Sequence, residues 1–195
     1  MAAGASSFDV VAMASSAGGL TALSGVVSAL PPGFGAGVVI VQHLDPRHRS
    51  LMADILGRRT SLPVKQAEAG DLLEEGRIYT APPNKHLLVN ADRSLSLTET
   101  ELVHFVRPSA DLLFESVAAS FRERAIAVVL TGTGSDGAMG VRAIKKMGGT
   151  VMAQDESAEF FGMPQAAIET GVVDFVLPLP EIISALLTLV PAPTA

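Results

Sequence analysis

Three residue types that can form a hydrolytic site stand at three separate turns of this sequence. Ser15 and Ser16 lie in MASSAGGL, His43 lies in VQHLD, and Asp136 lies in TGTGSDGAMG. A hydroxyl is a poor nucleophile at neutral pH, so an imidazole must take its proton while a carboxylate holds that imidazole in the right tautomer. A serine, a histidine and an aspartate therefore predict acyl transfer if the fold brings them together.

Each of these turns follows an apolar run that predicts a buried strand and precedes a stretch with helical spacing. The predicted strands are Asp9 to Met13, Gly37 to Gln42 and the uncharged start of Ala127 to Gly140. The helical stretches that follow them are Thr21 to Leu30, Leu51 to Arg58 and Ala138 to Met147. Open α/β sheets gather functional groups beyond the carboxyl ends of their strands. The three side chains are therefore expected at one edge of a parallel sheet.

The rest of the chain predicts a doubly wound α/β fold, with a mostly parallel sheet and helices on both faces. The middle of the chain reads as short antiparallel strands that include a hairpin near one sheet edge: Pro63 to Glu68, Arg77 to Thr80, His86 to Val89 and Ser94 to Thr98. A helix with Ser109 or Asp111 as its cap follows Pro108. The later elements are a strand at Thr150 to Glu156, a helix at Gln165 to Thr170, a strand at Val172 to Val176 and a helix at Glu181 to Leu189.

Each candidate residue also has an ordinary structural interpretation. Ser15 and Ser16 could both be helix caps, and they compete with each other for the role of nucleophile. His43 could be a hydrogen-bonded core or loop histidine, and Asp136 could be an N-cap of the helix that follows it. The hypothesis of a catalytic triad depends on the three positions coinciding at one edge of the sheet.

A dinucleotide site is the sharpest alternative in the same stretch. Gly132, Gly134 and Gly137 spell G-x-G-x-x-G between a strand and a helix, and Asp155 or Glu156 follows about 20 residues later, as that fingerprint requires. However, Asp136 would face the pyrophosphate, and the motif does not follow the first strand of the chain. An oxidoreductase is therefore the less favoured prediction.

Composition limits the classes of function. The 195 residues suit one domain, residues 1–195 with a core at about 9–189, and 48% hydrophobic with 17% charged residues is typical of an ordered globular protein. The net charge of -6, with no clustered basic face, disfavours nucleic acid as a partner. The absence of cysteine excludes disulfides and thiolate nucleophiles.

Neither a membrane span nor a metal site is expected. The interval from Val10 to Leu44 has no Asp, Glu, Lys or Arg, but SSAGG and PPGFGAG cut it into pieces shorter than the roughly 20 residues of a span. His43, Asp45 and His48 form a loose group of candidate metal ligands, but a charged turn explains them better, and no further ligand is close in sequence. We therefore expect a protein that is not embedded in a membrane and binds no metal.

The chain resembles the CheB-type chemotaxis protein-glutamate methylesterases, specifically their catalytic domain, from about Asp9 to Leu189. The likeness is carried by motifs that occur in the order and approximate spacing of that family: VAMASSAGG, VIVQHLD, YTAPPNKHLLV, RPSADLLFESVA, VVLTGTGSDGAMG and AQDESAEFFGMPQAAIETG. Several long motifs that agree are far more specific than any single turn.

The resemblance implies a cytoplasmic hydrolase with Ser16 as the nucleophile, His43 as the base and Asp136 as the carboxylate. Its substrates are glutamate γ-methyl esters on the cytoplasmic helices of methyl-accepting chemotaxis receptors, and it can also deamidate receptor glutamines. Both reactions pass through a glutamyl-serine ester and need no metal or organic cofactor. The receiver domain that precedes the catalytic domain in many members is absent from this sequence.

Two residues depart from the pattern of the family. Ala17 stands where a hydroxyl residue often follows the nucleophile, and Thr133 stands where other members can carry methionine near the expected oxyanion position. These departures leave a non-catalytic scaffold of the same fold as an alternative function. For docking of the receptor helix, we expect contributions from Arg107, Ser109 and Phe161.

Overall fold

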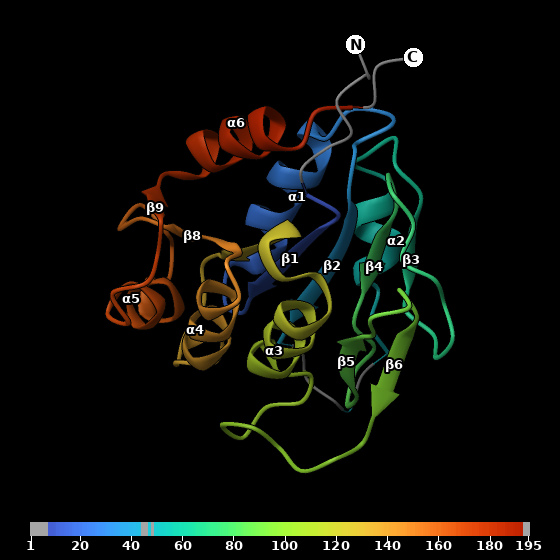
Figure 1. The fold of residues 1–195 in the computed structure, drawn as a ribbon, viewed down its shortest axis with the longest axis horizontal. Coiled ribbons are helices and arrows are strands. Elements are labelled where there is room, and N and C mark those ends of the chain that lie inside the picture. The colour runs from blue at the N-terminus through green and yellow to red at the C-terminus, as the bar shows by residue number, and fades with distance from the viewer. Residues whose placement is uncertain (1–7, 44–46, 48, 193–195) are drawn as a thin grey trace.

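The protein, described from a computed structural model over residues 8–43, 47 and 49–192, is built on one parallel sheet (Figure 1). This sheet has seven strands in the order β3-β4-β2-β1-β7-β8-β9. The strands are β1 (Val10–Ser15), β2 (Gly37–Gln42), β3 (Val64–Gln66), β4 (Ile78–Thr80), β7 (Ala125–Val129), β8 (Thr150–Gln154) and β9 (Phe175–Leu177). Every neighbouring pair within the sheet is parallel.

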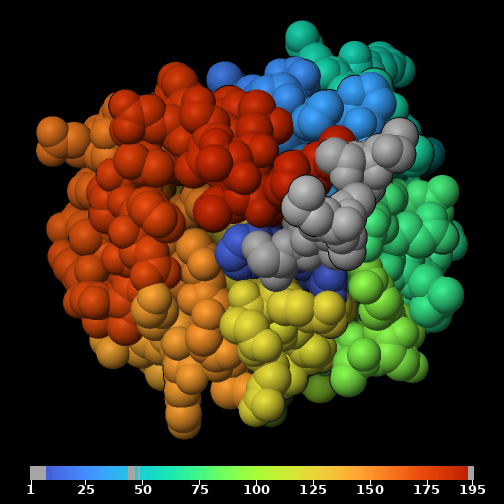
Figure 2. Space-filling view, turned by 45° about the horizontal axis from the view of Figure 1, so that its top comes forward, coloured from blue at the N-terminus to red at the C-terminus, as the bar shows by residue number. Residues whose placement is uncertain are grey.

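Helices cover both faces of the sheet, so the predicted doubly wound α/β class is confirmed. One face packs against α1 (Gly19–Ala29), α2 (Met52–Gly57) and α6 (Leu179–Leu189). The other packs against α3 (Ala110–Phe121), α4 (Ala138–Lys146) and α5 (Gly162–Ile168), and a short 3-10 helix, η1 (Arg122–Arg124), follows α3. Figure 2 shows α6, in red, against the blue N-terminal segment that contains α1. Over the described ranges, no helix is both long and apolar enough to cross a bilayer.

The centre of the sheet brings the three predicted turns together. β1 lies between β2 and β7, and the register pairs Ser15 with Gln42 and Ala14 with Val129. The residues of these three strands are buried because both faces of the sheet are covered. The chain winds outward from β1 in one direction and from β7 in the other, so the direction of winding reverses between them. Ligand sites of open α/β sheets form at such a point, beyond the carboxyl ends of the strands.

The prediction for the middle of the chain is wrong in part. β3 and β4 are parallel to each other and belong to the main sheet, although antiparallel strands were expected here. The long connection from Ala67 to Arg77 lets the chain return to the same end of the sheet before β4 begins. Only β5 (His86–Val89) and β6 (Leu95–Thr98) form the predicted antiparallel hairpin, as a separate two-stranded sheet.

The interpretation of Ser15 and Ser16 as helix caps is also wrong. β1 continues through Ser15, beyond the predicted end at Met13, and the N-cap of α1 is Gly18, with φ 75° and no side-chain cap. Glycine suits this left-handed conformation because it has no Cβ. Elsewhere the boundaries move by a few residues: α5 starts before Gln165, β9 starts after Val172 and α6 starts before Glu181.

Candidate active site

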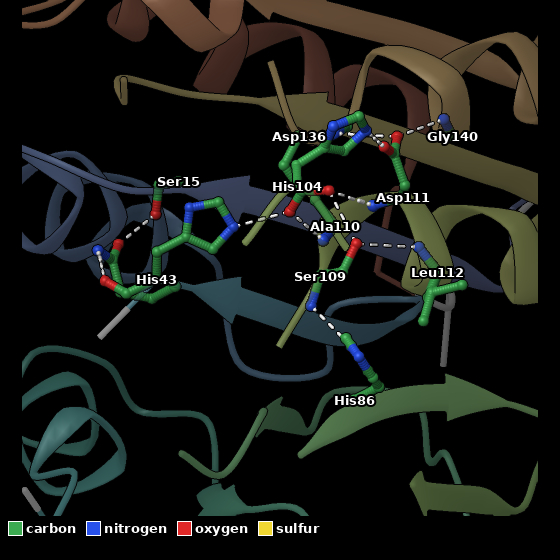
Figure 3. A network of polar contacts seen from close by, with 12 residues as sticks. Ser15, His43, His86, His104, Ser109, Ala110, Asp111, Leu112, Asp136 and Gly140 are labelled. Carbon is green, nitrogen blue, oxygen red and sulfur yellow. Dashed lines mark hydrogen bonds and ion pairs between the residues drawn. The ribbon is translucent and has the colours of Figure 1, made fainter. Parts of the chain in front are cut away.

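His43 and Asp136, which are 93 residues apart in the sequence, are in direct contact (Figure 3). The Nε2 atom of His43 lies 2.7 Å from Oδ2 of Asp136, and the two side chains are 11% and 3% exposed. His43 follows the end of β2, and Asp136 lies in the turn between β7 and α4. Figure 3 shows the second ring nitrogen of His43, Nδ1, on the side of the ring away from Asp136. The ring can therefore accept a proton at Nδ1 while Asp136 holds Nε2.

The carboxylate of Asp136 is fixed by the start of α3. Its Oδ1 accepts hydrogen bonds from Ser109 Oγ (2.8 Å) and Asp111 N (3.0 Å), and its Oδ2 also accepts one from Ala110 N (2.6 Å). Burial alone would raise the pKa of Asp136, but the hydrogen bonds from His43 and from these donors outweigh it and hold the pKa below its ordinary value. Asp136 is therefore ionised at neutral pH, as a carboxylate that orients a histidine must be.

Asp136 does not cap its own helix, which corrects one interpretation of the sequence. The N-cap of α4 is Gly137, which has no side-chain cap, whereas the Asp136 carboxylate accepts from the amides that begin α3. The predicted cap of α3 is confirmed, because Ser109 Oγ accepts from Leu112 N. Ser109 is fully buried, so the expectation that it helps to seat a receptor is wrong.

Ser16 and Ser15 have opposite environments. Ser15 is fully buried and its Oγ donates to Gln42 Oε1 at 2.5 Å. Ser16 is partly exposed just beyond β1 and lines a cavity. Among the described residues its hydroxyl has no hydrogen bond, to His43 or to any other side chain. The structure therefore places Ser16 at the same sheet edge as the His43–Asp136 pair, with its oxygen free to meet a ligand.

The turn around Ser16 is held by backbone contacts to the turn after β7. Ser16 N donates to Thr131 O at 3.0 Å, and Thr131 Oγ1 donates to Ala17 O at 3.0 Å. A Cβ on Gly132 would lie 2.9 Å from Cβ of Ser16 and 2.4 Å from the Met163 sulfur. Glycine at position 132 is therefore required for close packing against Ser16, and this explains the first glycine of the G-x-G-x-x-G pattern without a nucleotide.

A cavity of about 500 Å³ opens beside Ser16. It lies between the starts of α1 and α2, and most of the area that it exposes is apolar. The lining residues are Ser16, Gly18, Gly19, Leu20, Thr21, Gln42, Arg49, Ser50, Leu51, Met52 and Ile55. Neither Arg107 nor Phe161 lines this space; its large apolar side chains come from Leu20 of α1, from Leu51, and from Met52 and Ile55 of α2.

Arg107 lines a smaller cavity of about 140 Å³ on the other side of the site, together with His43 and Asn84. Its guanidinium donates to Asn84 Oδ1 at 2.7 Å and 3.1 Å, and to the carbonyl oxygens of Glu99 (2.9 Å) and Thr100 (2.7 Å). These bonds fix the segment before Arg107 beside His43. Phe161, at the N-cap of α5, is half-buried.

The predicted oxyanion residues belong to two different turns, Ala17 to the turn after β1 and Thr133 to the turn after β7. The Ala17 N–H has no hydrogen-bond acceptor among the described residues, so it can donate to a ligand. Thr133 is exposed in the turn after β7. The neighbouring Gly132 is fixed to the segment before α5, because its N–H donates to Phe160 O at 2.9 Å and its carbonyl accepts from Met163 N at 2.8 Å.

Sequence reasoning missed three residues that hold this site together, namely Gln42, Thr131 and Asp111. Gln42 and Thr131 contact the backbone of the Ser16 turn. Asp111 accepts at Oδ1 from Gly137 N (3.0 Å) and Gly140 N (2.7 Å), the start of α4. Their only signal in the sequence is a polar residue at the end of a buried strand or at the start of a helix, which does not reveal the partner.

The second oxygen of Asp111 lies 3.2 Å from Nε2 of His104. Burial raises the pKa of Asp111, and the nearby charge of Asp136 acts in the same direction, against the amides of Gly140 and Gly137 and the charge of His104. The two neighbouring aspartates therefore differ, and Asp136 keeps its charge to lower pH.

The described residues contain no group of three or more histidine, cysteine, aspartate or glutamate side chains that could hold a metal ion. Asp45 and His48, which the sequence places near His43, lie outside the described residues.

Comparisons with known proteins agree on one family. Residues 11–186 match the model of the family described as CheB methylesterase. A putative protein-glutamate methylesterase/protein-glutamine glutaminase from Leptospira interrogans is 40% identical over 176 residues, covering 90% of this chain and 91% of the relative. The crystal structure of the Thermotoga maritima CheB methylesterase catalytic domain is 37% identical, with a TM-score of 0.90 over 94% of this chain and 99% of that one.

Other relatives are longer than this chain. A protein-glutamate methylesterase/protein-glutamine glutaminase from Moorella thermoacetica is 42% identical over 187 residues, which cover 93% of this chain but 44% of the relative. The chain therefore spans nearly all of some curated relatives and about half of others.

Proposed function

Because this chain belongs to the CheB methylesterase family, we propose that it hydrolyses glutamate γ-methyl esters on the cytoplasmic helices of methyl-accepting chemotaxis receptors. Ser16, His43 and Asp136 form the triad, and receptor glutamines are deamidated at the same site. The reaction takes place in the cytoplasm. The observation that carries the proposal is the contact between His43 and the buried, ionised Asp136 at the sheet edge where Ser16 follows β1.

The reaction begins with proton transfer from Ser16 Oγ to Nδ1 of His43, while Asp136 holds Nε2. The serine oxygen attacks the ester carbonyl carbon, and the carbonyl oxygen takes the negative charge. When the tetrahedral intermediate collapses, His43 gives its proton to the departing methoxide, which leaves as methanol. The products of this half-reaction are methanol and a glutamyl-Ser16 ester.

The second half-reaction uses water as the nucleophile. His43 takes a proton from the water, the hydroxide attacks the glutamyl-serine ester, and the proton returns to Ser16 Oγ as the ester bond breaks. The receptor side chain leaves as a free glutamate. With a glutamine substrate the first step releases ammonia in place of methanol, and the second step is unchanged.

In this proposal, the Ala17 N–H donates a hydrogen bond to the negative oxygen of both tetrahedral intermediates. This N–H has no other acceptor among the described residues. Thr133, which is exposed in the turn after β7, is proposed as a second contact of this oxygen. Removing one such donor typically lowers turnover about 100-fold to 1000-fold. A backbone donor does not depend on the side chain, so alanine at position 17 is compatible with turnover.

In the same proposal, the receptor helix binds over the apolar cavity beside Ser16. Leu20 and Leu51 are 38% and 55% exposed and line this cavity, so they offer contact area to apolar side chains of a receptor helix. Arg107 and Phe161 are proposed as outer contacts, Arg107 at the cavity beside His43 and Phe161 at the start of α5.

The experiment that tests this function incubates the protein with a panel of methylated receptor fragments, measures methanol, and searches for the acyl-enzyme by mass spectrometry after an acid quench. We expect methanol release and a glutamyl adduct on the peptide that contains Ser16. Binding of a fragment with no methanol released would indicate a scaffold, and would contradict the proposed function.

A further inference from the structure

Gln42 is a buried amide that contacts both of the segments that carry the reacting groups. It is the last residue of β2, 8% exposed, and its side chain reaches the end of β1. Nε2 donates to Ser16 O at 2.7 Å and to His43 O at 3.1 Å, and Oε1 accepts from Ser15 Oγ at 2.5 Å. One side chain therefore fixes the backbone of the serine and of the histidine relative to each other.

The contact with Ser16 O also sets the direction of the next amide. A trans peptide unit is planar, so the carbonyl of Ser16 and the N–H of Ala17 lie in one plane and point in opposite directions. Gln42 Nε2 holds the carbonyl on the inner side of the turn, with help from Gly19 N at 2.9 Å. The Ala17 N–H is thereby directed away from Gln42.

The residues around Gln42 leave room for its side-chain amide and fix the orientation of that amide. A Cβ on Gly19 would lie 2.0 Å from Gln42 Oε1 and 2.5 Å from Ser15 Oγ, so no other residue fits there without a shift. Two carbonyl groups can only accept hydrogen bonds, so the NH₂ end of the amide must face them. The hydroxyl of Ser15 then supplies the donor for the other end.

We propose that Gln42 is a positioning residue that aims the Ala17 N–H at the developing oxyanion and holds His43 in register with Ser16, and that Ser15 sets the orientation of the Gln42 amide. This inference rests on the proposed function. It assigns a role to Ser15, which lies next to the nucleophile without reaching the substrate. Since the oxyanion forms only during reaction, loss of Gln42 acts on kcat and leaves KM largely unchanged.

The test compares Gln42→Glu and Gln42→Met with the wild type in the methanol-release assay. Glutamate has the same shape but no N–H to donate, and methionine fills similar space without either polar group. We expect kcat to fall about 100-fold in both variants, as for a lost oxyanion donor. We expect KM to stay within about 3-fold, as for an interaction made mainly in the transition state.

Ser15→Ala tests the smaller role given to Ser15, because it removes the hydrogen bond to Gln42 Oε1 but leaves both N–H donors of Gln42 in contact with their carbonyl acceptors. We expect its kcat to stay within about 5-fold of wild type, the effect of one neutral hydrogen bond. Circular dichroism melting of each variant separates lost folding from lost positioning.

The outcomes distinguish this inference from the proposed function. An active wild type together with a fully active Gln42→Met variant would overturn the role of Gln42 alone. Failure of both Gln42 variants to fold, or a rise in KM with unchanged kcat, would also overturn it. A wild type that releases no methanol from any methylated fragment would overturn the proposed function and this inference with it.

Discussion

Asp111 and Asp136 each hold the helix that begins beside the other. Asp111 N donates to Oδ1 of Asp136 at 3.0 Å, and Gly137 N, which follows Asp136, donates to Oδ1 of Asp111 at 3.0 Å. A carboxylate at a helix N-terminus is favoured by the unpaired N–H groups and by the helix dipole. These two hydrogen bonds hold the starts of α3 and α4 together. Backbone N–H groups therefore fix the Asp136 carboxylate, which in turn contacts His43.

Asp136→Asn is expected to lower kcat on the order of 10⁴-fold, because an amide cannot hold the histidine tautomer as a carboxylate does. Its NH₂ group would face either His43 and the Ala110 N–H, in the place of Oδ2, or the Asp111 N–H and the Ser109 hydroxyl, in the place of Oδ1. The measurement is methanol release under saturating substrate. Asp155→Asn is the control, since within the described part of the chain the Asp155 carboxylate accepts side-chain hydrogen bonds only from Ser157, through its N–H and its Oγ. Equal activity of the two variants would exclude a role for Asp136 in catalysis.

Asp111→Asn is expected to change the pH dependence of stability. Because the pKa of Asp111 is raised in the folded protein, its favourable contribution is present below the unfolded pKa, near 3.9, and is lost as pH rises through the folded pKa. The neutral variant avoids this loss. Its free energy of unfolding relative to wild type should therefore increase between about pH 4 and pH 7.

Urea unfolding of Asp111→Asn and the wild type at about pH 4 and pH 7 checks the sign of this change in relative stability. Asp92→Asn is a second variant, for which the opposite sign is expected. Hydrogen bonds from Ser94 lower the pKa of exposed Asp92, so its stabilising contribution appears above its unfolded pKa and is lost as pH falls. Asp92→Asn should lose stability relative to wild type as pH rises. A constant difference between Asp111→Asn and wild type at both pH values would be inconsistent with the environment described for Asp111.

Ser109→Ala removes two contacts of one hydroxyl. Ser109 Oγ donates to Asp136 at 2.8 Å and accepts from Leu112 N as the cap of α3. We expect a loss of about 1 kcal/mol in the free energy of unfolding, as for other N-caps. We also expect kcat to fall about 10-fold, because one bond to the Asp136 carboxylate is lost. Ser184→Ala, at an exposed site in α6, should change stability by less than about 0.5 kcal/mol. Similar effects in both variants would argue against the role of Ser109.

Gly132→Ala is expected to displace the Ser16 turn. The added Cβ would lie 2.4 Å from the Met163 sulfur and 2.9 Å from Ser16 N, so the backbone must shift. We expect kcat to fall at least about 100-fold, because small displacements of reacting groups cost this much. Gly25→Ala, inside α1 with its nearest neighbour 3.5 Å away, should keep activity and gain about 0.5–1 kcal/mol in stability. Full activity of Gly132→Ala would show that this contact is not needed.

The sequence predicts the fold class and the three turns well because buried parallel strands have unbroken apolar runs. Val10 to Met13 and Gly37 to Gln42 carry that signal directly, and both are strands in the structure. It predicts the direction of β3 and β4 poorly, because short runs such as Val64–Gln66 show that a strand exists but not how it pairs.

The partners of the site residues could not be predicted for a different reason. In the sequence Asp136 stands just before α4, yet its carboxylate accepts hydrogen bonds from the start of α3. The two come close only because α3 packs against α4 in the folded protein. Gln42 looks like an ordinary strand end until β1 and β2 are placed in register. Such contacts depend on tertiary structure, and local patterns do not encode them.

The central claim is that Ser16, and not its neighbour Ser15, attacks the ester. The most direct test measures methanol release from a methylated receptor fragment by the wild type, Ser16→Ala and Ser15→Ala, with folding checked by circular dichroism. We expect Ser16→Ala to fall to the uncatalysed background, while Ser15→Ala stays within about 5-fold of the wild-type rate. A folded Ser16→Ala variant that releases methanol at close to the wild-type rate would contradict this claim.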